Sequence, residues 1–65
     1  MRRSWSSREV IQVLRSEGWY FTDAVGDHYH FRHAVKTGKA TVTHPKKDVS
    51  RTVLDGIEAV TWLKF

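Results

Sequence analysis

The fold is decided by residues 19–33, which read WYFTDAVGDHYHFRH. Aromatic and β-branched residues dominate the part before Gly26 and recur in the part after Asp27. These residue types favour strands, and a Gly-Asp pair between two such runs favours a tight turn. The stretch therefore predicts two antiparallel strands, Trp19–Val25 and His28–His33.

The segment before this hairpin has the pattern of a capped helix. Ser6 is followed three residues later by Glu9, which is the spacing of a capping box, and an apolar stripe follows. Gly18 is well placed to end the helix. The pattern predicts a helix over Ser7–Glu17.

The segment after the hairpin predicts one more strand and one more helix. Lys39–Thr43 alternates as a strand does and must stop near Pro45. Apolar residues then recur at helical spacing, at Val49, Val53, Ile57 and Val60. Residues 61–65 are aromatic enough to pack on a partner. We predict an α+β fold of the order α-β-β-β-α, double-stranded-RNA-binding-domain-like, whose three-stranded antiparallel sheet is covered on one face by two helices; residues 1–65 form a single domain.

Composition narrows the class of protein. The 65 residues contain no cysteine, which excludes a disulfide scaffold and a thiolate zinc site. Neither a signal peptide nor a membrane span is indicated, so a cytoplasmic location with no membrane partner is expected. Eleven Lys and Arg against seven Asp and Glu give a net charge of +4, which favours an anionic partner such as nucleic acid, although solubility alone also explains such a charge.

Side-chain alternation divides the second strand into two faces. Burial of the face with Tyr29 and Phe31 under the helices leaves the other face open. The residues expected on that open face are His28, His30 and Arg32. His44 is expected at its rim.

Most of the other aromatic residues are expected in the core rather than on a base-stacking surface. This expectation covers Trp5, Trp19, Phe21, Tyr29, Phe31 and Trp62. Tyr20 is the aromatic side chain best suited to exposure.

The open face carries groups that suit RNA cleavage. A base must take the proton of the 2′-hydroxyl and an acid must protonate the leaving oxygen, and histidine titrates near neutral pH. Arg32, Lys46 and Lys47 can neutralise phosphates. His30, His44, a lysine or water could supply the second catalytic group. The alternative interpretation is that these histidine, arginine and lysine side chains are ordinary solvated surface residues without a function.

Zinc is the alternative use of the histidines. His28, His30 and His44 could share one ion, but catalytic zinc needs three protein ligands and structural sites usually include thiolates. We therefore predict no metal and no other cofactor.

The residues that carry the hairpin and third strand resemble the HicA toxins of bacterial and archaeal toxin-antitoxin pairs. The matching pieces follow one another along the chain: a short helix, Glu17-Gly18-Trp19, Gly26-Asp27-His28-Tyr29-His30-Phe31, Thr41-Val42-Thr43-His44-Pro45 and a closing helix. Their order is more specific than any one of them. Asp27 departs from the family, in which serine is usual before the histidine.

The resemblance implies a toxin that cleaves messenger RNA without a metal and is held in check by a HicB-like antitoxin, in a complex that can be oligomeric. It also implies that His28 is the catalytic residue. We interpret Gly26 as the turn that presents it, and His30, Arg32, Lys46 and Lys47 as contacts to RNA. Two rivals are a non-catalytic RNA-binding module and a protein-interaction subunit.

Overall fold

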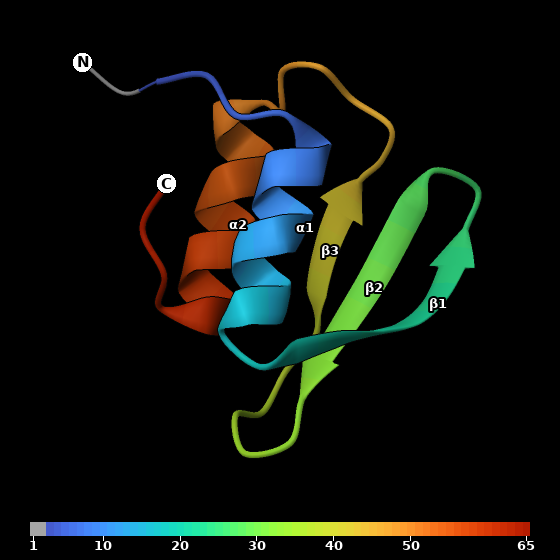
Figure 1. Cartoon of the computed structure of the whole chain (residues 1–65), viewed down its shortest axis with the longest axis vertical. Helices are drawn as coiled ribbons and strands as arrows, with labels where there is room; N and C mark the ends of the chain where they lie inside the picture. Colours follow the sequence, from blue (N-terminus) through green and yellow to red (C-terminus); the bar gives the residue numbers. More distant parts are fainter. Residues whose placement is uncertain (1–2) are drawn as a thin grey trace.

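The computed structural model describes residues 3–65 as two helices and three strands. In chain order these are α1 (Ser7–Ser16), β1 (Trp19–Val25), β2 (His28–His33), β3 (Ala40–Thr43) and α2 (Arg51–Thr61) (Figure 1). The strands form one antiparallel sheet in the order β1-β2-β3. The predicted α-β-β-β-α layout is confirmed, with element ends shifted by a residue or two.

The start of α1 is fixed by the predicted capping box. The backbone N–H of Glu9 donates to Ser6 Oγ at 3.2 Å, and the N–H of Ser6 donates to Glu9 Oε1 at 3.0 Å. The helix stops before Gly18, whose φ of +93° lies in the left-handed region that glycine tolerates best. The chain then turns directly into β1.

The hairpin has the tight turn at Gly26-Asp27 that the sequence predicts. Val25 pairs with His28, so Gly26 and Asp27 alone form the connecting turn, and Gly26 has a φ of +60°. A bulge between Phe21 and Asp23 shifts the register farther along the hairpin. The turn thus lies at the end of β2 that carries His28.

One face of the sheet supplies the core. Phe31 and Val42 from this face are almost fully buried, as are Leu14 from α1 and Ile57 from α2. Tyr29 lies on the same face and is half-buried. The face that the sequence predicts to be buried is therefore the one that packs against the helices.

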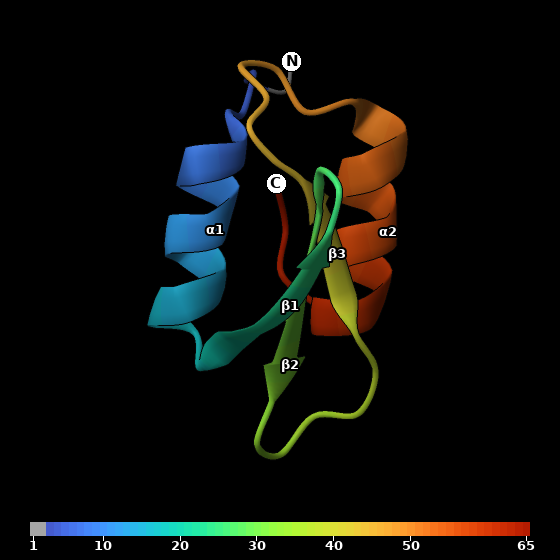
Figure 2. The same cartoon turned by 90° about the vertical axis from the view of Figure 1, so that its right-hand side faces the viewer.

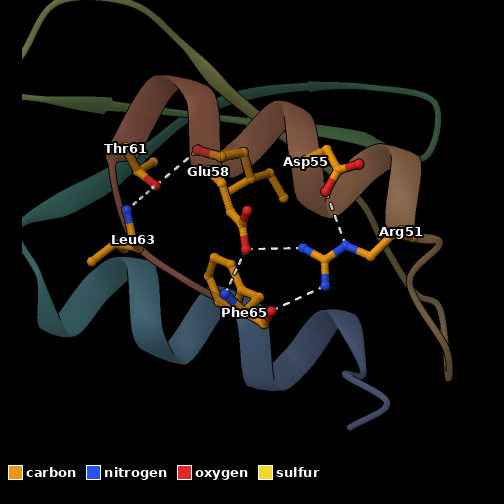
Figure 3. Close-up of polar contacts among 7 residues, drawn as sticks. Arg51, Asp55, Glu58, Thr61, Leu63 and Phe65 are labelled. Carbon is orange, nitrogen blue, oxygen red and sulfur yellow. Dashed lines mark hydrogen bonds and ion pairs between the residues drawn. The ribbon is translucent and has the colours of Figure 1, made fainter. Parts of the chain in front are cut away.

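The segment after α2 runs back between the two helices, where Figure 2 shows it in red. Glu58 accepts a hydrogen bond from the backbone N–H of Phe65 at 2.7 Å, and Arg51 donates to the carbonyl of Phe65 at 3.0 Å (Figure 3). The Phe65 ring packs edge-on against Trp5 with centroids 5.1 Å apart. Phe65 therefore packs into this domain's own core, and the expectation that the aromatic segment 61–65 packs on a partner is wrong for Phe65.

Two aromatic side chains predicted to be in the core are instead exposed. Trp62 is 80% exposed and Phe21 is 51% exposed. Trp62 adopts a left-handed conformation that reverses the chain toward Phe65 and leaves its own ring outside. Phe21 touches the rings of Tyr29 and Phe31 but remains half open to solvent. The predicted exposure of Tyr20 is confirmed.

Candidate active site

The uncovered face of the sheet brings together the three β2 residues that the sequence places there. His28 pairs with Thr43, and His30 pairs with Thr41. The Nδ1 atom of His30 lies 3.0 Å from Thr41 Oγ1, within hydrogen-bond distance. Arg32 is exposed farther along the same strand. Strand alternation therefore predicted the grouping of these side chains correctly.

A hollow of about 380 Å³ lies where this face meets α2. It is lined by His28, Lys39, Thr41, Thr43, Thr52, Val53, Gly56 and Ile57. We call it the His28 hollow. Because β2 and β3 are antiparallel, His28 lies at the Thr43 end and Lys39 lies at the opposite end of β3. Its lining contains an imidazole, an ammonium and three hydroxyl groups, and no carboxylate.

Lys39 is the residue of this hollow that the sequence analysis did not single out. It precedes Ala40 and Thr41, and Thr41 also lines the hollow. Side chains two positions apart in a strand lie on the same face, so Lys39 shares the open face with Thr41 and Thr43. The sequence therefore contained the information that places Lys39 there. What the sequence did not show is that α2 lies alongside and makes that face hollow.

Asp27 lies beside the His28 ring. The distance from His28 Nε2 to Asp27 Oδ1 is 3.4 Å, and the two side chains are 60% and 63% exposed. Side chains of neighbouring residues within a strand point to opposite faces, but Asp27 belongs to the turn and escapes that rule. Its carboxylate can therefore act on the imidazole from outside the hollow.

His44 does not lie on the rim of the open face, as the sequence analysis expected. Its ring packs edge-on against Tyr29 with centroids 4.9 Å apart, and its Nδ1 lies 2.6 Å from Ser7 Oγ. Tyr29 is on the helix-covered face, so His44 points away from His28. The reason is alternation: Thr43 faces the hollow, and the next side chain faces the other way.

The lysines after Pro45 line a different hollow. Lys46 and Lys47 border a space of about 330 Å³ at the start of α1, together with Arg8 and His44. The backbone of Lys46 is anchored there, since its N–H donates to Ser7 Oγ at 2.9 Å. The structure thus separates these two lysines from the His28 hollow.

His33 has a structural role. Its Nδ1 accepts hydrogen bonds from the backbone N–H groups of Val35 and Lys36, at 3.0 and 3.1 Å. The proton of the neutral ring must then be on Nε2, which donates to the carbonyl of Glu17 at 3.1 Å. His33 ties the β2–β3 loop to the end of α1.

The described residues hold no group of three or more His, Cys, Asp or Glu side chains arranged to bind a metal ion. No helix in residues 3–65 has the length and apolar character to cross a membrane. What the open face offers chemically is an exposed imidazole with a carboxylate beside it and cations along the same surface.

Comparison with known proteins identifies the family of this chain. No curated protein matches the chain. The sequence model of the family described as the HicA toxin of bacterial toxin-antitoxin matches residues 7–64, which is nearly the whole chain and includes both helices and all three strands. The chain belongs to the HicA toxin family, the toxins of bacterial toxin–antitoxin systems whose partner is an antitoxin.

Proposed function

We propose that this toxin is an endoribonuclease that cleaves messenger RNA and thereby blocks translation, with His28 as its catalytic residue. The observation that carries the proposal is that His28, in a chain of the HicA family, lies exposed at the edge of a hollow on the open face of the sheet. Its imidazole is 60% exposed and borders a hollow that also contains Lys39 and three threonine hydroxyls. A substrate can reach it without any rearrangement of the core.

The reaction that suits this site is internal transfer at an RNA phosphate. His28 accepts the proton of the 2′-hydroxyl, and the 2′-oxygen forms a bond to the adjacent phosphorus. The bond from phosphorus to the 5′-oxygen breaks, and that oxygen takes a proton from water, which reaches the exposed hollow. His28 then gives the proton that it took to the hydroxide left behind. The products are a 2′,3′-cyclic phosphate and a 5′-hydroxyl. His28 acts as a base only through a ring nitrogen that carries no proton.

Positive charge along the site would stabilise the phosphate as negative charge builds up on it. Lys39 lines the His28 hollow, and Arg32 is exposed on the same face of the sheet. His30 is held against Thr41 and can donate from its other ring nitrogen. We assign these three residues to the RNA backbone near the cleaved bond.

Lys46 and Lys47 take a different place in the proposal. They border the hollow at the start of α1, so we assign them to phosphates of the same RNA beyond the cleaved bond. The backbone N–H of His44 donates to the carbonyl of Asp27 at 2.8 Å, which holds this loop next to the turn that carries Asp27. Gly26 shapes that turn and so presents His28.

The direct test compares His28→Ala with His30→Ala on purified, folded protein. We expect His28→Ala to reduce the cleavage rate by at least about 100-fold, the usual scale of general base catalysis, and His30→Ala to reduce it far less. The products of wild-type cleavage should carry 2′,3′-cyclic phosphate ends. An RNA with 2′-deoxyribose at the cleaved position should remain intact.

Two results would refute the assignment. Cleavage by folded His28→Ala at the wild-type rate would remove His28 from the chemistry. Salt-dependent RNA binding without any cleavage by wild type would make the protein a binding module, and co-purification with an antitoxin without RNA binding would make it a protein-interaction subunit.

A further inference from the structure

A third hollow lies beside the last turns of α2. Its volume is about 550 Å³, larger than that of the His28 hollow. It is lined by Val35, Lys36, Thr37, Gly38, Ala59, Val60 and Trp62. These residues come from the β2–β3 loop and from the end of α2, so we call it the Trp62 hollow. None of them is part of the catalytic proposal above.

The His28 hollow and the Trp62 hollow follow one another along the same two segments, the one that leads into β3 and α2. Lys39 lines the first and its neighbour Gly38 lines the second. On α2, Gly56 lines the first, and Ala59, about one turn later, lines the second. Lys39 lies four positions before Thr43, or about 13 Å along the strand. A path therefore leads from His28 along β3 and α2 to Trp62.

Trp62 caps the end of α2, a position that does not require a tryptophan side chain. Its φ of +65° puts a bulky side chain in the left-handed region, where glycine is the usual residue after a helix. Its ring is 80% exposed and thus contributes little to the core. A residue that strains the backbone and leaves its ring in water is a candidate for function.

The surroundings of Trp62 favour an anionic ligand with flat rings. Lys36 Nζ lies 5.9 Å from the centre of the Trp62 ring and 3.2 Å from the carbonyl of Thr61, which holds the ammonium beside the indole. Lys39 lies between Lys36 and His28 along this path and lines the His28 hollow. Neither hollow has a carboxylate in its lining. Basic side chains that alternate with an exposed aromatic ring are typical of surfaces that bind single-stranded nucleic acid.

We propose that single-stranded RNA runs along β3 and α2 from the cleaved phosphate at His28 to Trp62, where an unpaired base stacks on the indole. Lys39 and Lys36 contact the RNA phosphates that lie between His28 and Trp62. A base can stack on a side chain only when it is free of its own helix, so the site selects single strands over duplexes. This inference rests on the proposed function, because it takes RNA as the substrate.

Binding of an uncleavable RNA separates this idea from catalysis. We would measure, by fluorescence anisotropy, the affinity for labelled 2′-O-methyl oligonucleotides of about eight residues, a length within the usual range of single-strand sites. The variants are Trp62→Gly, which suits the left-handed backbone, Trp62→Phe, which keeps an aromatic ring, and Lys39→Ala. Arg15→Ala on α1 removes an equal charge outside both hollows and is the matched control.

We expect Trp62→Gly to weaken single-strand binding by about tenfold and Trp62→Phe to weaken it much less, because stacking on an aromatic ring tolerates the change. Trp62→Gly should fold with an unchanged or higher melting temperature, so the loss cannot come from unfolding. Lys39→Ala should weaken binding more than Arg15→Ala does. Wild type should bind the single strand more tightly than the matching duplex.

Failure of this inference differs from failure of the proposed function. If wild type cleaves RNA but Trp62→Gly binds the single strand as tightly as wild type, the stacking site is wrong and the nuclease stands. Preference for the duplex would likewise overturn the stacking site. If Trp62→Gly loses single-strand binding while wild type cleaves nothing, the stacking site stands and the proposed catalysis fails. A wild type that neither binds nor cleaves RNA overturns both.

Discussion

The Nε2 atom of His28 lies 3.4 Å from Oδ1 of Asp27, its neighbour in the hairpin turn. The pair sits at the surface, with both side chains more than half exposed. A carboxylate at this distance can accept a long hydrogen bond from Nε2 and thereby leave Nδ1 as the proton acceptor. Solvent weakens such a contact, so its effect on reactivity must be small.

The first prediction concerns this contact. Asp27→Ala should reduce the cleavage rate by less than about tenfold, since an exposed ion pair contributes at most about 1 kcal/mol. Asp27→Ser, which introduces the residue usual in HicA toxins, should retain activity. The rate measured across a range of pH at constant ionic strength checks both variants. A loss as large as that of His28→Ala would show that Asp27 itself takes part in the chemistry.

The second prediction follows from the capping box. The backbone hydrogen bond from Ser6, and to a lesser extent the Ser6 hydroxyl and nearby Arg3, hold the pKa of Glu9 below its ordinary value of 4.5. A pKa lowered by folding means that the ionised form stabilises the fold at pH values above the ordinary one. This stabilisation is lost as the pH falls through the lowered pKa.

Glu9→Gln should therefore be less stable than wild type at neutral pH, and the difference should shrink as the pH falls below 4.5. Urea unfolding at a series of pH values measures it. A stability difference that stays constant down to the most acidic pH would show that the charge of Glu9 does not contribute to stability.

The third prediction concerns Gly56, which lies within α2. A Cβ added at this position would meet nothing within 4 Å, and the residue is exposed. Gly56→Ala should therefore stabilise the domain by roughly 0.5–1 kcal/mol, the ordinary difference in helix propensity. Chemical denaturation checks the value. Destabilisation would mean that α2 departs from regular helix geometry at this point.

The local structure was largely predictable from the sequence, because its signals act over a few residues. Ser6 and Glu9 specify the start of α1, and Gly26-Asp27 between two strand-like runs specifies the hairpin and its register. The register then fixes which face carries His28. Alternation is a property of one strand and needs no knowledge of the rest of the fold.

The candidate site was predicted less completely, because its shape depends on contacts between distant segments. Alternation along residues 39–43 implied that Lys39 faces outward, but only the position of α2 beside β3 makes this face a hollow. Lys46 and Lys47 were assigned to phosphates because the histidine face was expected nearby, whereas the structure places them at a separate hollow beside the start of α1. Trp62 was expected in the core because hydrophobic residues usually are, whereas the reversal of the chain after α2 exposes it.

The fourth prediction returns to the junction that orients β1. A Cβ added to Gly18 would lie 2.8 Å from His33 Nε2, closer than such contacts occur, and the φ of +93° would strain any other residue. The same His33 nitrogen is bonded to the carbonyl of Glu17, so the ring cannot move aside without breaking that bond. Gly18→Ala should therefore destabilise the domain by about 1–3 kcal/mol.

The double variant with His33→Ala separates the two causes of this loss. Removal of the imidazole relieves the clash but leaves the backbone strain, so Gly18→Ala should cost less free energy of unfolding in the His33→Ala background than in wild type. Equal costs in the two backgrounds would assign the whole effect to the backbone. Because Gly18 lies at the opposite end of β1 from the turn that holds His28, each folded variant should still cleave RNA at close to the wild-type rate.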